Sequence, residues 1–262
     1  MASFDVIFLG GGPAGYVGAI RCAQLGLSVG VVEREGLGGT CVLWGCIPAK
    51  ALLESAAVAH RAKEAKTFGV NVGEISTDYA VAMKRSRAVS TQNSKGVEFL
   101  FKKHKITWLL GTGTLTGKKT VSVKDAKGAV TTHDAKKAIV ISTGSRVKGI
   151  PAIGLELDKQ NILSSDDVLV LEKAPATMAI VGCGAVGVEF GDVFNEFGTK
   201  VTMLETMPSM LPVEDADVAT ELARSFKKRG IEVILNAKID GAKVGKGSVK
   251  LSLSGPEKKE LT

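Results

Sequence analysis

The stretch Gly10-Gly11-Gly12-Pro13-Ala14-Gly15 decides the fold, because it joins an apolar run to a helical stretch in a G-x-G-x-x-G pattern. The run Val6-Ile7-Phe8-Leu9 before it is typical of a buried strand, and the helical stretch continues to about Gly26. A β-rich run over residues 28–32 follows and leads directly to Glu33. Strand, glycine turn, helix and a second strand with an acid at its end are the order of a dinucleotide-binding βαβ unit.

The same pattern occurs a second time in the chain. Ala179-Ile180-Val181 leads into Gly182-Cys183-Gly184-Ala185-Val186-Gly187, a helical stretch follows to about Gly198, and the run 200–204 leads to Glu205. In both copies the acid stands 23 positions after the first glycine. One such motif is weak evidence, since glycine-rich turns are common, and two structural turns that bind nothing are the alternative. Two copies in matched contexts predict two dinucleotide-binding units.

Each residue type in the motif has a physical reason. The first glycine makes the tight turn, the second lets a pyrophosphate approach the backbone, and the third lets the helix lie close to its strand. The helix N-terminus supplies free amide donors and the positive end of its dipole, and the acid accepts hydrogen bonds from a ribose diol. The residues that we expect to bind dinucleotides on this basis are Gly10, Gly12, Pro13, Ala14, Gly15 and Glu33, and in the second copy Gly182, Gly184, Gly187 and Glu205.

The second acid also bears on the choice of nicotinamide. A carboxylate at Glu205 would repel a 2′-phosphate, and residues 206–211 contain no arginine to attract one. We therefore expect NAD in preference to NADP. Arg34 follows Glu33 in the first copy, but neighbouring side chains on a strand point to opposite faces, so we do not expect it to bind a phosphate.

Two cysteines stand five positions apart in the stretch Gly38-Gly39-Thr40-Cys41-Val42-Leu43-Trp44-Gly45-Cys46-Ile47-Pro48-Ala49-Lys50. In an ideal helix such residues are separated by a rise of about 7.5 Å, which exceeds the usual separation across a disulfide. A bridge therefore needs a distorted first turn, which Gly45 permits. Such a bond is easily reduced, as a catalytic disulfide must be.

Two other interpretations of the cysteine pair stay open on the residues alone. The cysteines could serve as small apolar side chains, or as half of a zinc site. Zinc needs two further ligands, and the remaining Cys22 and Cys183 belong to the two nucleotide helices. Beside a dinucleotide fold, the redox interpretation is favoured.

Length and composition exclude several classes of protein. The 262 residues predict two domains, and 45% apolar with 23% charged residues is typical of globular chains. The net charge of +7 comes from small dispersed basic groups with few aromatic neighbours, which does not indicate nucleic acid. We identify no stretch long enough to span a bilayer and no leader before Ser3, so we expect a cytoplasmic protein without membrane contact.

The segment 38–50 closely resembles the G-G-T-C-x-N-x-G-C-I-P-S-K signature of the pyridine nucleotide–disulfide oxidoreductases, and residues 139–145 are similar to the strand and A-T-G-S turn that contacts FAD in that family. The resemblance implies an α/β fold with two Rossmann-like dinucleotide-binding domains. They would be an FAD domain over 1–148, with a helical excursion over 48–105, and an NAD domain over 149–262. It also implies a homodimer whose C-terminal interface domain is absent here, so we expect the chain to be a fragment.

The resemblance implies specific roles for the redox segment. Cys46 would lie against the flavin as the charge-transfer thiolate, and Cys41 would exchange with the substrate. Lys50 would lie near flavin N5 and form a buried pair with Glu189 that polarises the flavin during hydride transfer. Further FAD contacts are implied for Gly39, Thr40, Lys50, Thr143 and Gly144.

Within the family, Ile47-Pro48-Ala49-Lys50 is most similar to the members that oxidise protein-bound dihydrolipoamide with NAD⁺. That implies a lipoyl-bearing subunit of a 2-oxo acid dehydrogenase or glycine cleavage complex as partner. Mercuric- or glutathione-reductase-like chemistry, another flavin enzyme with structural cysteines, and a non-catalytic nucleotide-binding fragment are the alternatives. Leu43 replaces the signature's Asn and Ala49 its Ser, and Trp44 is bulky beside the disulfide.

Enzymes of this type need a base for the substrate thiol, which is usually a histidine. The chain contains His60, His104 and His133, and we expect surface or structural roles for all three because no acidic partner is nearby in sequence. The family carries its His–Glu dyad in the interface domain.

Overall fold

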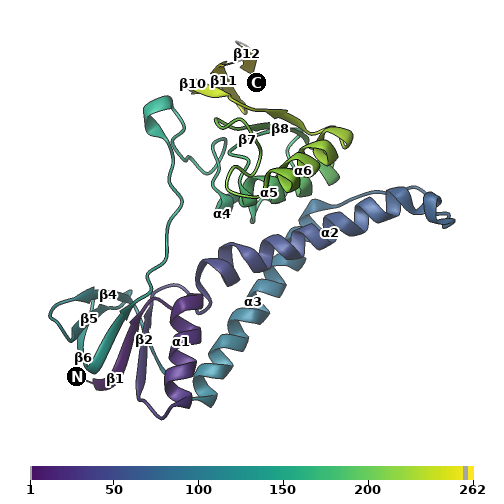
Figure 1. The fold of residues 1–262 in the computed structure, drawn as a ribbon. Coiled ribbons are helices and arrows are strands. Elements are labelled where there is room, and N and C mark those ends of the chain that lie inside the picture. The colour runs from purple at the N-terminus through teal and green to yellow at the C-terminus, as the bar shows by residue number, and fades with distance from the viewer. Residues whose placement is uncertain (1, 256–258) are drawn as a thin grey trace. The chain divides into compact units, whose positions relative to one another are not determined.

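The computed structural model describes residues 2–255 and 259–262. Its internal contacts divide the chain into two units (Figure 1), one formed by residues 1–48 and 86–146 and the other by residues 49–85 and 147–262. Each unit is described by itself below.

The first unit is built on one six-stranded sheet with the order β3-β2-β1-β6-β5-β4. The strands β1 (Ala2–Leu9), β2 (Val29–Glu33), β3 (Thr107–Leu110) and the end of β6 (Val130–Ile141) are parallel neighbours. The strands β4 (Thr112–Leu115) and β5 (Thr120–Lys124) add antiparallel pairs at one edge. The order 3-2-1 with a further strand on the other side of β1 is the Rossmann arrangement.

Both faces of β1 are covered, which explains its continuous apolar run. Val6 and Phe8 are buried in one cluster with Ala19 of the helix α1 (Pro13–Gln24), which lies against β1 and β2 (Figure 1). Ile7 and Leu9 point to the other face and are buried with residues of β5 and β6. The alternation places one face of the sheet against helices and the other against its own antiparallel extension.

The second unit repeats the βαβ plan on a smaller sheet. The parallel strands β7 (Thr177–Val181), β8 (Lys200–Leu204) and β9 (Glu232–Ile234) alternate with the helices α5 (Ala185–Glu196) and α6 (Ala216–Lys228). A separate antiparallel sheet contains β10 (Lys238–Val244), β11 (Val249–Ser254) and β12 (Lys259–Leu261). Short helical turns occupy Ala65–Phe68, Pro151–Ile153 and α4 (Ser165–Val168).

Aromatic side chains fill the core of the second unit. Phe194 of α5 is fully buried and lies stacked on Tyr79, with ring centroids 5.1 Å apart. Burial raises the pKa of the Tyr79 hydroxyl, which donates a hydrogen bond to the carbonyl of Val168. The predicted α/β class with two Rossmann-like units is confirmed, whereas the predicted domain boundary near residue 148 stays a prediction.

Two long helices, α2 (Cys46–Glu64) and α3 (Tyr79–Lys103), occupy the region predicted as a helical excursion. The helical run 40–68 is long and apolar enough to cross a membrane by length and composition alone, with a third of its most apolar window buried. Our sequence prediction that no stretch reaches this length was wrong. Because Leu52 and Ala56 of the run are fully buried among core residues of the second unit, we interpret it as a core helix.

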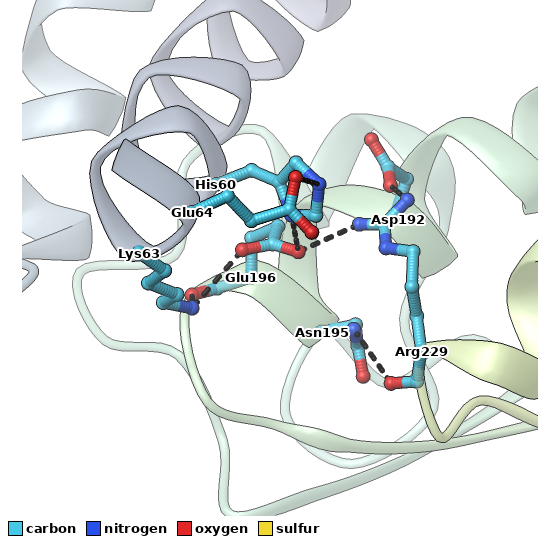
Figure 2. Close-up of polar contacts among 7 residues, drawn as sticks. All are labelled: His60, Lys63, Glu64, Asp192, Asn195, Glu196 and Arg229. Carbon is cyan, nitrogen blue, oxygen red and sulfur yellow. Dashed lines mark hydrogen bonds and ion pairs between the residues drawn. The ribbon is translucent and has the colours of Figure 1, made fainter. Parts of the chain in front are cut away.

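An ion-pair cluster joins α2 to α5 within the second unit (Figure 2). The Glu196 carboxylate, only 6% exposed, lies 3.0 Å from His60 Nδ1, 3.0 Å from Lys63 Nζ and 2.8 Å from an Arg229 Nη2. Glu64, one helical turn after His60, lies 3.3 Å from its Nε2. The expectation that His60 lacks an acidic neighbour in sequence was therefore wrong, although its role here is the structural one predicted.

Candidate redox and dinucleotide-binding site

The first glycine turn is fixed by very close backbone approaches. Gly10 has φ +107°, and a Cβ on it would lie 2.2 Å from the carbonyl oxygen of Ser142. A Cβ on Gly15 would lie 1.9 Å from the Gly10 oxygen. The Ser142 hydroxyl donates to the carbonyls of Leu9 and Gly10, which joins the ends of β1 and β6. The first and third motif positions therefore accept only glycine.

The second glycine turn has nearly the same geometry. Gly182 has φ +102°, and a Cβ on Gly187 would lie 2.0 Å from the Gly182 oxygen. The N-cap glycines match as well, with φ −74° and ψ −173° at Gly12 and φ −75° and ψ −179° at Gly184. The sequence repeat is thus a structural repeat.

The helices that follow these turns have uncapped N-termini. Within the described residues, no side chain caps α1 or α5, and neither has an acidic residue in its first turn. By contrast, Ser164 forms a capping box on α4, and Asp215 caps α6. Helix N-termini without a capping side chain suit an anion such as a pyrophosphate. A first turn without acids and a backbone approachable at glycine fit FAD and NAD.

The two motif acids bind the glycine turns themselves. Glu33 Oε2 accepts a hydrogen bond from the Gly11 N–H at 2.9 Å, and Glu205 Oε2 accepts one from the Cys183 N–H at 2.9 Å. Burial would raise the pKa of Glu205, but hydrogen bonds from the backbone of Cys183 and Met207 outweigh it and hold the pKa below its ordinary value. Each acid is ordered by its turn, and a ribose contact from either remains a prediction.

The redox segment contains the distortion that the five-residue spacing required. Residues Thr40–Trp44 form a π-helical turn, Gly45 leaves helical geometry with φ −147° and ψ −113°, and α2 begins at Cys46. Cys41 lies within the π-turn, and Cys46 follows it after Gly45. A Cβ on Gly45 would lie 3.1 Å from the Thr40 oxygen, so glycine allows the close return of the chain. Cys46 is exposed and Cys41 half-buried.

The redox segment lies directly against the first glycine turn. A Cβ on Gly39, whose φ is +58°, would lie 2.5 Å from the Gly12 Cα, and the Gly38 N–H donates to the Gly11 oxygen at 2.9 Å. Thr40 and, just after β6, Thr143 and Gly144 are exposed. The first unit thus gathers its predicted FAD residues at the carboxyl ends of parallel strands, where ligands bind in such sheets.

Lys50 and Glu189 meet within the second unit although 139 positions separate them. The Lys50 Nζ lies 2.5 Å from Glu189 Oε1, joining α2 to α5. Their side chains are 60% and 25% exposed, so the pair contributes little to stability. The predicted pairing of Lys50 with Glu189 is present, but the pair is not buried as expected. The contact of Lys50 with FAD remains a prediction.

The other two cysteines do not join the pair. Cys183 is buried, and its burial together with the nearby Glu205 raises its pKa to about 12. Cys22 lies half-buried on α1. Among the described residues, no group of three or more His, Cys, Asp or Glu side chains could hold a metal ion.

A cavity of about 890 Å³ borders the second glycine turn. It lies wholly within the second unit, where Gly182, Gly184 and Gly187 line one part and residues of β7 line another. Its size is in the range of ligand pockets, so it can take part of a dinucleotide.

Sequence reasoning missed two sets of contacts. One is the Glu196 cluster, for which the pair His60 and Glu64 at helical spacing was an available signal. The other is a row of buried serines on α3, spaced four residues apart, which hydrogen bond to the redox segment: Ser86, Ser90 and Ser94.

Two βαβ units whose glycine turns lead into uncapped helices, one of them against a cysteine-bearing π-turn, are typical of dinucleotide-binding proteins. The model of the family described as "Pyridine nucleotide-disulphide oxidoreductase" matches residues 4–262. The chain therefore belongs to this family.

Among curated proteins, the chain is 47% identical over 252 residues to the dihydrolipoyl dehydrogenase of Chlorobaculum tepidum, covering 96% of this chain and 53% of that one. It is 42% identical over 243 residues to the dihydrolipoyl dehydrogenase of Bacillus subtilis, covering 90% and 51%. The chain thus spans about half the length of these relatives.

Solved structures show the same fold. A Cu(II) complex of the HOCl-induced flavoprotein disulfide reductase RclA from Escherichia coli matches with a TM-score of 0.83 and 26% identity, over 100% of this chain and 55% of that one. LpdA from Mycobacterium tuberculosis matches with a TM-score of 0.87 and 24% identity, over 100% and 56%.

Proposed function

We propose that this chain carries the FAD site, the NAD site and the redox pair of an enzyme that oxidises protein-bound dihydrolipoamide with NAD⁺. The observation that carries the proposal is the π-turn that contains Cys41 and leads through Gly45 to Cys46, in a segment that lies against the first glycine turn. The dihydrolipoyl dehydrogenases at 40–47% identity support the choice of dithiol.

The chemistry at the cysteine pair is thiol–disulfide exchange. A substrate thiolate attacks Cys41, the bond to Cys46 breaks, and the second substrate thiolate then displaces Cys41. The substrate leaves as a cyclic disulfide, and the pair has gained two electrons and two protons. Cys46, the leaving group of the first exchange, is exposed and stands at the first residue of α2.

FAD, when bound, carries the electron pair from the thiols to NAD⁺, which becomes NADH. On the chain's own side, Gly10, Gly12 and the first turn of α1 would hold the FAD pyrophosphate, and Gly39, Thr40, Thr143 and Gly144 would line the same edge. The second copy, from Gly182 to Glu205, would hold NAD. Lys50, fixed by Glu189, would present its ammonium group to the flavin.

Partners follow from the same assignment. The dithiol would be presented by the lipoyl-bearing subunit of a 2-oxo acid dehydrogenase or glycine cleavage complex, and the enzyme would act as a homodimer in the cytoplasm. The FAD domain would extend to about residue 148 and the NAD domain from residue 149.

The test is anaerobic mixing of the FAD-loaded chain with dihydrolipoamide, followed by alkylation and peptide mass spectrometry of residues 41–46. The proposal predicts that dihydrolipoamide reduces the disulfide faster than reduced glutathione at equal thiol concentration. Equal or faster reduction by glutathione would contradict the choice of substrate. Cys22→Ser, which removes a thiol remote from the pair in sequence, is the control.

A further inference from the structure

Three serines on α3 point away from their own helix. Ser86, Ser90 and Ser94 repeat every four residues and so lie on one helix face. Their exposed fractions are 0%, 0% and 8%. Within a helix, a serine or threonine hydroxyl often hydrogen bonds to the carbonyl four residues back, as Thr91 does to Arg87. The three buried serines instead use their hydroxyls elsewhere.

Each buried serine donates to a backbone carbonyl in or beside the redox segment. Ser94 donates to the Leu37 oxygen at 2.6 Å, Ser90 to the Val42 oxygen at 2.6 Å, and Ser86 to the Pro48 oxygen at 2.8 Å. The three carbonyls lie before, within and after the π-turn. All six residues belong to the first unit.

Arg87, on the same helix, contacts Leu43, which replaces the Asn of the family signature, and the bulky Trp44. Its Nη1 donates to the Leu43 oxygen at 2.5 Å, and its guanidinium carbon lies 4.6 Å from the centroid of the Trp44 ring. Stacking of a guanidinium on an indole is favourable. A backbone carbonyl and one aromatic ring between the two cysteines thus have a partner on α3.

These contacts matter because a π-helical turn is energetically unfavourable by itself. Runs of this type are rare and short, and a buried carbonyl without a donor costs free energy comparable to a lost hydrogen bond. The hydroxyls and the guanidinium supply donors from a rigid neighbouring helix. The turn is therefore held from outside as well as by its own backbone.

We propose that a set of four positioning residues on α3, called the serine clamp below, keeps Cys41 and Cys46 within bridging range while both are thiols. The serine clamp consists of Ser86, Ser90, Ser94 and the neighbouring Arg87. The proposal rests on the proposed function, because the serine clamp acts on the redox pair. In the disulfide form the covalent bond itself holds the turn. In the dithiol form the serine clamp alone holds the turn. Loss of the serine clamp therefore gives the two thiols more conformational freedom and shifts the thiol–disulfide equilibrium toward the dithiol.

The test measures the thiol–disulfide equilibrium of the 262-residue chain against the dithiothreitol couple. Disulfide formation passes two electrons and two protons to oxidised dithiothreitol, whose ring opens to the dithiol. Samples equilibrated anaerobically are quenched with acid, alkylated, and scored by mass spectrometry of the peptide containing both cysteines. The variants are Ser90→Ala and Arg87→Gln, and the matched control on the same helix is Thr91→Ala.

The serine clamp predicts that Ser90→Ala and Arg87→Gln each favour the dithiol by about tenfold, which corresponds to about 30 mV. Thr91→Ala should match the parent. Equilibria of both clamp variants equal to that of Thr91→Ala would overturn the proposal. If Ser90→Ala fails to fold by circular dichroism, Arg87→Gln, at a half-buried position, decides alone. A parent chain that forms no Cys41–Cys46 disulfide would overturn the proposed function as well, whereas a parent that cycles with unshifted variants overturns only the clamp.

Discussion

Replacing two glycines of the first unit by alanine should change stability in opposite directions. Gly15 is the third glycine of the first motif, and Gly96 lies inside α3. A Cβ on Gly15 would lie 1.9 Å from the Gly10 oxygen, whereas a Cβ on Gly96 meets no heavy atom within 4 Å. The added methyl group therefore clashes with a backbone carbonyl at Gly15 and enters open space at Gly96.

The magnitudes follow from these distances. Relief of the Gly15 contact needs a shift of more than an ångström in the backbone of the turn, since a carbonyl cannot rotate away as a side chain can. Overpacking of this kind costs roughly 2 kcal/mol or more. Alanine inside a helix stabilises by about 0.5–1 kcal/mol relative to glycine. The two variants should differ by about 3 kcal/mol in the free energy of unfolding.

Urea unfolding followed by far-ultraviolet circular dichroism measures both variants against the parent. The expected result is a lower midpoint for Gly15→Ala and a higher one for Gly96→Ala, with FAD retention lost only in the former. A Gly15→Ala chain as stable as the parent would refute the argument that contact at the third glycine fixes the turn.

Three further predictions concern the cysteines and the ion-pair cluster. Gly45→Ala places a Cβ 3.1 Å from the Thr40 oxygen and should destabilise the disulfide form of the cysteine pair by about 1 kcal/mol. An unchanged thiol–disulfide equilibrium with dithiothreitol would contradict this prediction. Cys183 is buried and its pKa is raised to about 12, so it should resist alkylation by iodoacetamide at pH 8. The exposed Cys46 of the reduced chain should be alkylated under the same conditions. Equal labelling of both cysteines, measured by peptide mass spectrometry, would contradict this prediction. Burial would raise the pKa of Glu196, but its cationic partners outweigh burial and lower the pKa below its ordinary value. Its contribution to stability is therefore complete above the ordinary glutamate pKa and is lost as pH falls through the lowered one. Glu196→Gln should lower the free energy of unfolding by about 3 kcal/mol at pH 7. The difference in urea midpoint between the variant and the parent should shrink as the pH is lowered toward 3. A difference that does not depend on pH would contradict a stabilising role of the ion pairs.

Local signals predicted much of the fold. The run 200–204 forms β8 as predicted, and the helical stretches predicted to end near Gly26 and Gly198 end two residues earlier, at Gln24 and Glu196. A distorted turn beside the cysteine pair was predicted, since two cysteines five apart cannot bridge in a regular helix. Its form, a π-helical turn over Thr40–Trp44, was not predicted.

Contacts between distant segments were harder to predict. Nothing local to His60 indicates that Glu196, 136 positions away, will receive it. Likewise, the sequence did not indicate that Glu33 and Glu205 would accept hydrogen bonds from backbone amides of their own glycine turns. Backbone N–H groups in a turn need a hydrogen-bond acceptor. Which acceptor lies within hydrogen-bond distance is decided only when the chain folds.

The central claim is that the first glycine turn and the cysteine pair serve one flavin. An anaerobic titration of the FAD-loaded chain with dithionite or NADH, followed by visible absorbance, tests it most directly. The account predicts a long-wavelength thiolate–flavin band after uptake of two electrons, lost in Cys46→Ser and retained in Cys183→Ser. A chain that cannot be loaded with FAD, or a band unaffected by Cys46→Ser, would contradict it.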